Sequence, residues 1–246
     1  TFGMYKFDAA VNAAQAIPVK RNADFSLDTG HIRSIVDQYQ PKLIFVTSPN
    51  NPDGGWLPDD RLEQLLAMPA VIVLDEAYVE FAGAQRSRIT QVPERENLIV
   101  LRTFSKWAGL AGLRIGYGAF PLSLMPHLWK IKQPYNVPVA SSEAAIAVLE
   151  QSDYLDMHIA RMVAERERMQ TRLAAIPYLA PYPSQSTFIL CRVIDHDAHE
   201  LKQYLEQQGI LIRYYRTPRL RDHVRFSVGR PDQMDRVFDV LENYQG

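Results

Sequence analysis

Short apolar runs alternate with amphipathic segments through the first half of the chain. Continuous apolar runs are typical of strands that are covered on both faces. These runs lie at residues 43–47, 71–74 and 98–101. The segment that follows Asp28, a candidate N-cap, carries Ile32, Ile35 and Val36 on one helical face. Alternating strands and helices predict an α/β fold, with a mainly parallel sheet flanked by helices.

The same pattern predicts the remaining elements. Pro18 makes residues 16–20 an edge strand rather than a central one. Asp59 or Asp60 is expected to cap the helix that carries Leu62. Helices are expected at 7–12, 122–131, 140–149 and 154–173, and a strand at 115–119. On the long helix at 154–173, charged pairs such as Arg161 and Glu165 indicate a solvated face.

The pattern changes after Pro177, where short strands at 187–191, 210–213 and 224–228 alternate with helices at 196–208 and 231–244. We therefore expect two domains. Residues 1–152 would form a large ligand-binding domain, and residues 153–246 a smaller C-terminal α/β domain.

Composition and charge remove several classes of function. The chain has 246 residues, of which 47% are hydrophobic, and a net charge of -1. Near-zero charge gives no reason to expect nucleic acid or a membrane surface as a partner. No apolar run is long enough to span a bilayer, and no signal peptide is recognisable. Cys191 is the single cysteine, so no intrachain disulfide forms and the cytoplasm is the expected compartment. The six histidines show no metal-ligand spacing, so we expect no metal.

The most informative chemistry lies in residues 101–117. Thr103, Ser105 and Lys106 follow an apolar run, and Arg114 comes eight residues after the lysine. An amine can bind a carbonyl covalently, while hydroxyls and a guanidinium can hold a phosphate. The segment therefore suits a phosphorylated carbonyl compound. The plainer alternative is a surface lysine in a loop whose hydroxyl groups cap the turn.

Two further polar residues follow predicted strands. Asn51 comes after the run at 43–47, and Asp75 directly follows the run at 71–74. Ligands bind beyond the carboxyl ends of strands in open α/β sheets, so Asn51, Asp75 and Lys106 are expected to converge there. An unpaired buried carboxylate at Asp75 would be costly unless it met a cationic group. The alternatives are a carboxylate that caps the next turn and an asparagine that only forms one.

Four motifs in order resemble those of the class I and II aminotransferases, the fold-type I pyridoxal-phosphate enzymes. They occupy residues 48–54, 75–81, 101–117 and 224–229, and they are most similar to those of histidinol-phosphate aminotransferases. The resemblance implies pyridoxal 5'-phosphate as cofactor, with Lys106 as its Schiff-base and catalytic lysine. Asp75 would meet the ring nitrogen, and Asn51 and Tyr78 the phenolic oxygen.

The resemblance also assigns the remaining candidate residues. Thr103, Ser105 and Arg114 would hold the cofactor phosphate. Phe2 stands where the family has an aromatic residue stacked on the ring, usually Tyr. Arg213 and Arg225 would bind the anionic end of the substrate. Three departures from the family pattern, Asp53, Thr187 and Arg230, bear on substrate preference rather than on cofactor binding.

Residues 1–5 resemble the middle of the family motif Pro-Thr-Tyr-x-Met-Tyr, so we expect an N-terminally incomplete large domain. The absent part would include a turn that binds the cofactor phosphate and a tyrosine that reaches across a homodimer interface. A chain without them could be inactive.

The expected reaction is transfer of an amino group between histidinol phosphate and the glutamate/2-oxoglutarate pair in histidine biosynthesis. Threonine-phosphate decarboxylase and aromatic aminotransferase activities are enzymatic alternatives. A non-catalytic, aminotransferase-like binding module is the alternative from another class.

Overall fold

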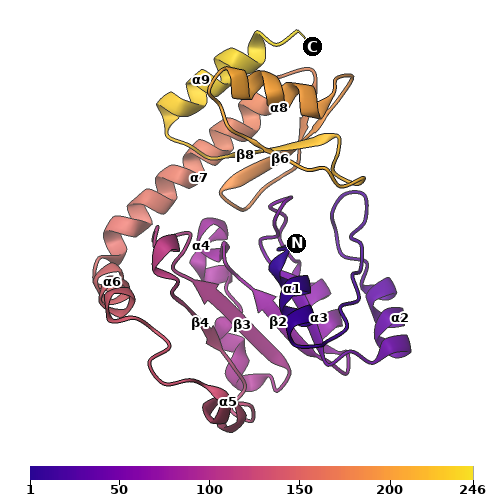
Figure 1. Cartoon of the computed structure of the whole chain (residues 1–246), viewed down its shortest axis with the longest axis vertical. Coiled ribbons are helices and arrows are strands. Elements are labelled where there is room, and N and C mark those ends of the chain that lie inside the picture. The colour runs from indigo at the N-terminus through magenta and orange to yellow at the C-terminus, as the bar shows by residue number, and fades with distance from the viewer. Residues whose placement is uncertain (246) are drawn as a thin grey trace. The chain divides into compact units, whose positions relative to one another are not determined.

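The computed structural model describes residues 1–245, which form two compact units (Figure 1). The first unit comprises Thr1–Asn51 and Gly55–Ser152. The second comprises the chain from Asp153 onward together with the short segment Pro52–Gly54. Assignment of this turn to the second unit is not indicated by the sequence pattern.

The first unit contains a four-stranded sheet in the order β1-β2-β3-β4. Its strands are β1 (Leu43–Thr47), β2 (Val71–Asp75), β3 (Leu98–Thr103) and β4 (Gly116–Ala119). The first three are parallel, and β4 runs antiparallel to β3. This arrangement confirms the mainly parallel sheet. Thr47 pairs with Asp75, and Asp75 pairs with Leu101, so the carboxyl ends of β1, β2 and β3 meet at one edge.

Helices and 3-10 turns connect these strands. The helices are α1 (Met4–Val11), α2 (Thr29–Tyr39), α3 (Asp59–Leu66), α4 (Val79–Ala82), α5 (Met125–Ile131) and α6 (Val139–Glu150). The 3-10 turns are η1 (Ala84–Arg86), η2 (Ile89–Glu94) and η3 (Ala111–Leu113). Val36 of α2 and Leu65 of α3 are buried with Ile72 and Leu74 of β2 in one apolar cluster. Each such side chain contributes about 1.5–3 kcal/mol by leaving water.

Helix starts in this unit agree only partly with the sequence expectation. Asp28 accepts a hydrogen bond from the His31 backbone N–H at 2.9 Å, which confirms it as the N-cap of α2. The expected cap of α3 is wrong, because Pro58 occupies the N-cap and Asp59 and Asp60 lie in the first turn. There the two carboxylates still interact favourably with the helix dipole. Residues 16–20 form no strand, since no backbone ladder pairs them.

The second unit contains an antiparallel sheet in the order β5-β6-β8-β7. Its elements are α7 (Ser152–Ala174), β5 (Leu179–Pro181), β6 (Phe188–Val193), α8 (Ala198–Gln207), β7 (Arg213–Tyr214), β8 (His223–Ser227) and α9 (Pro231–Glu242). Strand β5 was not expected. Of residues 210–213, only Arg213 joins the sheet.

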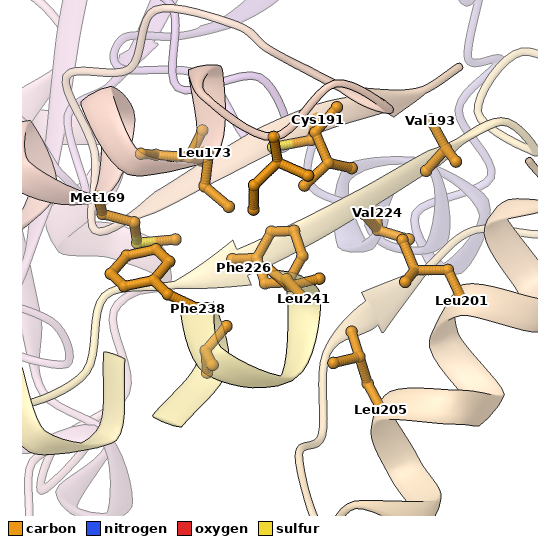
Figure 2. Close-up of a cluster of buried hydrophobic side chains, with 14 of the residues drawn as sticks. Met169, Leu173, Cys191, Val193, Leu201, Leu205, Val224, Phe226, Phe238 and Leu241 are labelled. Atoms are coloured by element: carbon orange, nitrogen blue, oxygen red, sulfur yellow. The ribbon is translucent and has the colours of Figure 1, made fainter. Parts of the chain in front are cut away.

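One face of this sheet is covered by helices, and their side chains form a single core (Figure 2). Val224 and Phe226 of β8 point into it beside Cys191 of β6. Phe238 of α9 and Leu201 of α8 pack from the helical side. Burial raises the pKa of the Cys191 thiol well above its ordinary value, so the sulfur is an inert apolar group.

The charge pattern of α7 also differs in detail from the expectation. Glu165 is 8% exposed rather than solvated, and it accepts from Arg168 at 2.7 Å instead of pairing with Arg161. Arg168 also reaches Asp235 of α9 at 2.6 Å. These pairs therefore fasten α7 to α9 within the second unit.

The turn Pro52–Gly54 packs closely against the loop that precedes β6. The Gln185 backbone N–H donates to the Gly54 carbonyl at 2.8 Å. Gly54 has a φ of +75°, and a Cβ at this position would lie 2.0 Å from the Ser184 hydroxyl oxygen. Both the backbone conformation and the close approach therefore require glycine.

Candidate active site

Polar side chains gather where the parallel strands of the first unit end. Asp75 closes β2, Tyr78 stands before α4, and Lys106 lies in the turn after β3. The Lys106 Nζ atom lies 5.7 Å from the centre of the Tyr78 ring. Two turns that are separate in sequence are thus brought together, with the lysine exposed. Asp75 and Lys106 thus lie at the same edge of the sheet, as the sequence led us to expect.

Asp75 is half-buried, and both of its carboxylate oxygens are engaged. Oδ1 accepts the Ala77 backbone N–H at 2.9 Å, and Oδ2 accepts the Tyr5 hydroxyl. The bond to Ala77 is the turn-capping role that the sequence offered as an alternative. A carboxylate has about four acceptor positions, so two contacts leave capacity for a cationic N–H group. Capping and ligand binding are therefore compatible in this residue.

The hydroxyl-rich turn after β3 is held by its own side chains. The Thr103 hydroxyl oxygen accepts the Ser105 backbone N–H at 3.0 Å and lies 3.4 Å from the Ile115 carbonyl. Arg114 is exposed and has a φ of +54°, in the left-handed region that arginine rarely adopts. Its Nη1 donates to the Ala111 carbonyl at 2.9 Å. Such a conformation persists where the surroundings over-determine it, often at ligand sites.

The turn after β1 presents Asn51 beside this edge. Asn50 is buried, accepts the Thr47 hydroxyl through Oδ1 and donates its backbone N–H to the Gly55 carbonyl at 2.8 Å. Those bonds order the turn in which half-buried Asn51 follows. Phe2 is 51% exposed, and its ring meets that of Tyr5 edge-to-face at 5.9 Å.

Two buried carboxylates lie on the segment that follows Asp75. Glu76 accepts the Arg88 backbone N–H at 2.7 Å and the Ser87 hydroxyl at 2.5 Å. Glu80 accepts Arg102 Nη2 at 2.5 Å. Burial raises the pKa of each carboxyl, opposed for Glu80 by Arg102. Their contacts hold the Asp75–Tyr78 turn to β3 and to the loop before η2.

The second unit places two arginines opposite each other. Arg213 of β7 pairs with Arg225 of β8 across the antiparallel ladder, so their side chains leave the same face of the sheet. The Arg225 guanidinium lies 4.4 Å from the centre of the Phe188 ring, and that of Arg213 lies 5.4 Å from the Tyr215 ring. Two like charges in direct opposition destabilise a sheet, unless an anion is bound between them.

Two aromatic residues that were not expected lie beside candidate residues, each within its own unit. Tyr5 contacts Asp75, although 70 positions separate them in sequence. Tyr215 follows β7, where burial raises its pKa while Arg225 and Arg213 oppose the shift. No local pattern reveals the first contact. The second could have been found from its spacing, because Tyr215 lies two residues after Arg213. Within residues 1–245, no three His, Cys, Asp or Glu side chains group as metal ligands.

The fold and these groups define a class of enzyme that binds a phosphorylated carbonyl cofactor at the carboxyl edge of an α/β sheet. The residues fit such a group, because Asp75 keeps acceptor capacity, Lys106 supplies an exposed amine beside Tyr78, and a strained Arg114 borders the same turn. Among the described residues, no helix is long and apolar enough to cross a membrane.

Comparison with known proteins gives the family. A family model described as "Aminotransferase class I and II" matches residues 1–241. Histidinol-phosphate aminotransferase 1, chloroplastic, of Arabidopsis thaliana is 51% identical over 245 residues, covering 99% of this chain and 58% of that relative. The chain thus spans less than two thirds of that protein. It belongs to the class I and II aminotransferases, a family that uses pyridoxal phosphate.

Solved structures match at lower identity. A histidinol-phosphate aminotransferase from Sinorhizobium meliloti, in complex with pyridoxal-5'-phosphate, is 28% identical with a TM-score of 0.86, covering 98% of this chain and 68% of that one. L-threonine-O-3-phosphate decarboxylase from Porphyromonas gingivalis is 26% identical with a TM-score of 0.82, covering 98% of this chain and 74% of that one. Both chains share the fold described above.

Proposed function

We propose that this chain carries the cofactor site and the substrate arginines of a transaminase that exchanges an amino group between histidinol phosphate and the glutamate/2-oxoglutarate pair, in histidine biosynthesis. The observation that supports it most directly is the approach of Lys106 to Tyr78 at the sheet edge that Asp75 closes. The relatives named histidinol-phosphate aminotransferase, one of which is 51% identical, favour this substrate.

Each residue at the edge has a distinct task. Asp75 would accept a hydrogen bond from the protonated ring nitrogen, and Asn51 and Tyr78 would donate to the phenolic oxygen. Thr103, Ser105 and Arg114 would hold the phosphate, and Phe2 would stack on the ring. When bound, pyridoxal phosphate supplies an electron sink for the electron pair left at the substrate Cα. Lys106 would be the base that takes the proton from the substrate Cα.

The paired arginines support an anionic substrate. Histidinol phosphate carries a phosphate, while glutamate carries a distal carboxylate, and a guanidinium can bind either in a bidentate manner. Arg213 and Arg225 stand on one face with aromatic rings beneath them, which orients both guanidinium groups. One face can therefore serve both substrates of the exchange.

We also propose a cytoplasmic homodimer with no nucleic-acid or membrane partner. The near-neutral charge and the single, buried Cys191 support this environment. Light scattering of the purified protein would give its mass directly, and a monomer at micromolar concentration would contradict the dimer. Fractionation of cells that express the native protein would test the compartment.

The visible absorption spectrum with pyridoxal phosphate tests the cofactor site. We expect a band that requires Lys106 and disappears in Lys106→Ala. Lys130→Ala, which removes an exposed lysine on α5, is the matched control and should keep the band. Because free aldehydes react with surface lysines, a band that survives equally in both variants would contradict the proposed site.

Addition of substrates then distinguishes the reactions. Histidinol phosphate or glutamate should bleach the band, and each should yield its 2-oxo product. Arg213→Ala should weaken the response to histidinol phosphate about tenfold, because a charged hydrogen bond is lost, without changing the cofactor band. Carbon dioxide release from threonine phosphate would instead favour a decarboxylase, whose solved fold is also similar. A band that ignores every donor would favour a binding module.

A further inference from the structure

The hydroxyl group of Tyr5 donates a hydrogen bond to Asp75 Oδ2. Tyr5 lies in the first turn of α1, and Asp75 closes β2, so the bond joins the start of the chain to the middle of the sheet. Helix α1 accordingly lies beside β2 in Figure 1. A second contact nearby joins the hydroxyl oxygens of Thr1 and Thr47 at 3.2 Å.

The ring of Tyr5 is held from two sides. It stacks on Phe45 of β1 at 4.9 Å with the planes 30° apart, and it meets Phe2 edge-to-face at 5.9 Å. Burial raises the pKa of the Tyr5 phenol well above its ordinary value, and the charge of Asp75 adds to the increase. The phenol therefore stays protonated, and it is a donor rather than an acceptor at neutral pH.

The two bonds of Asp75 fix the plane of its carboxylate. The Ala77 N–H engages Oδ1, and the Tyr5 hydroxyl engages Oδ2. A carboxylate with one anchored oxygen can still rotate about its last side-chain bond, whereas one with both anchored cannot. The same phenol also contacts Phe2, the residue proposed to cover the cofactor ring.

We propose that Tyr5 is a positioning residue for the cofactor. It would orient the Asp75 carboxylate for the ring nitrogen and hold the side chain of Phe2, which is proposed to stack on the ring. This inference rests on the proposed function, since it gives Tyr5 a role only where Asp75 binds a protonated ring nitrogen. This role acts through Asp75 and Phe2 and requires no contact between Tyr5 and the cofactor.

A double-mutant cycle on cofactor affinity tests this role. Tyr5→Phe keeps the ring on Phe45 and Phe2 and removes only the hydroxyl. We expect it to weaken the binding of pyridoxal phosphate about tenfold, as for a hydrogen bond to a charged group. In the Asp75→Asn background the same change should alter the affinity less than twofold, because the charged acceptor is gone. Tyr39→Phe, at an exposed phenol, is the control and should change nothing.

Hydrogen exchange of the cofactor-free protein gives an independent readout. Loss of the bond should speed amide exchange across α1 in Tyr5→Phe but not in Tyr39→Phe. Equal affinity losses in both Asp75 backgrounds would show that the hydroxyl acts elsewhere and would overturn the inference. So would tighter binding in Tyr5→Phe, which would make Tyr5 a competitor for the carboxylate.

The failure of this inference differs from the failure of the proposed function. If the unmodified chain binds the cofactor through Lys106 and Tyr5→Phe binds it equally well, only the role of Tyr5 is wrong. If no lysine-dependent binding occurs, the proposed function falls and the inference with it. In either case, unchanged amide exchange across α1 in Tyr5→Phe would show that the hydrogen bond between Tyr5 and Asp75 does not stabilise this helix.

Discussion

Arg102 and Glu80 form an ion pair beneath the candidate site, with Arg102 Nη2 2.5 Å from Glu80 Oε1. Their side chains are 13% and 6% exposed, so both charges have left water. The pair joins β3 to α4, directly after the turn that carries Asp75 and Tyr78. The attraction between the two charges offsets the unfavourable free energy of removing each from water, so each residue is stable in this position only with the other.

Removal of one partner of the Arg102–Glu80 pair should therefore destabilise the protein strongly. Arg102→Met would leave Glu80 buried without its counter-charge, and we expect the free energy of unfolding to fall by about 3–5 kcal/mol. Arg95→Met is the control, because its pair with Glu63 is half-exposed and worth less than about 1 kcal/mol. Urea denaturation measures both. The double variant Arg102→Met/Glu80→Leu should recover most of the loss, and a loss as large as in the single variant would contradict this account.

The stability of the first unit should depend on pH through Glu76. Burial raises the pKa of this carboxyl above its ordinary value of 4.5. Between the pKa of the unfolded state and the raised pKa of the folded state, the folded protein binds more protons at Glu76 than the unfolded chain does. The contribution of Glu76 to the free energy of unfolding is therefore fully present below pH 4.5 and is lost as pH rises through the folded pKa. Glu76→Gln keeps an acceptor for the Arg88 N–H and removes the charge.

We accordingly expect Glu76→Gln to gain stability relative to the unchanged protein as pH rises from 4.5 toward 8. Urea unfolding at several pH values measures the difference. Glu63→Gln, at an exposed carboxyl of the same unit, should show no such trend. A difference for Glu76→Gln that is constant with pH would mean that burial does not govern this group.

The turn Pro52–Gly54 should tolerate no side chain at Gly54. An alanine there would have to hold a φ of +75° and would place its Cβ 2.0 Å from the Ser184 hydroxyl oxygen. We expect Gly54→Ala to destabilise the second unit by about 2–4 kcal/mol, from strain and overpacking together. Gly112→Ala is the control, since nothing lies within 4 Å of its added Cβ. Differential scanning calorimetry would detect the change.

The mainly parallel sheet of the first unit was predictable from its apolar runs, because continuous apolar residues need cover on both faces and alternating helices make neighbouring strands parallel. Residues 16–20 show where that reasoning stops. A sequence pattern can indicate an extended segment. A strand also needs a neighbouring strand to pair with, and the pattern within the segment does not show whether one is present. Residues 210–212 failed in the same way, as only Arg213 and Tyr214 pair with β8.

The candidate site was predictable where a residue stands at a strand end, as for Asp75 and Lys106. It was not predictable where two distant residues meet through packing. Tyr5 reaches Asp75 because α1 lies against β1 and β2, a placement fixed by the Phe45 contact and not by any spacing. Glu165 illustrates the same limit on a helix. The burial of Glu165 depends on how α7 packs against neighbouring elements. Glu165 therefore forms an ion pair with Arg168 and not the expected pair with Arg161.

Arg114 should show a trade between stability and cofactor binding. Its φ of +54° is unfavourable for an L-residue with a side chain but not for glycine. Arg114→Gly should therefore raise the free energy of unfolding by up to about 1 kcal/mol in the cofactor-free protein. The same change removes the guanidinium proposed to bind the phosphate, so the affinity for pyridoxal phosphate should fall about tenfold.

The opposite signs separate this residue from an ordinary surface arginine. Arg33→Gly, at an exposed position inside α2, should lower the free energy of unfolding by about 1 kcal/mol and leave cofactor affinity unchanged. Urea unfolding and a cofactor titration measure the two quantities on the same samples. If Arg114→Gly lost stability as Arg33→Gly does, the left-handed backbone would not be strained. If it kept its affinity, Arg114 would not hold the phosphate.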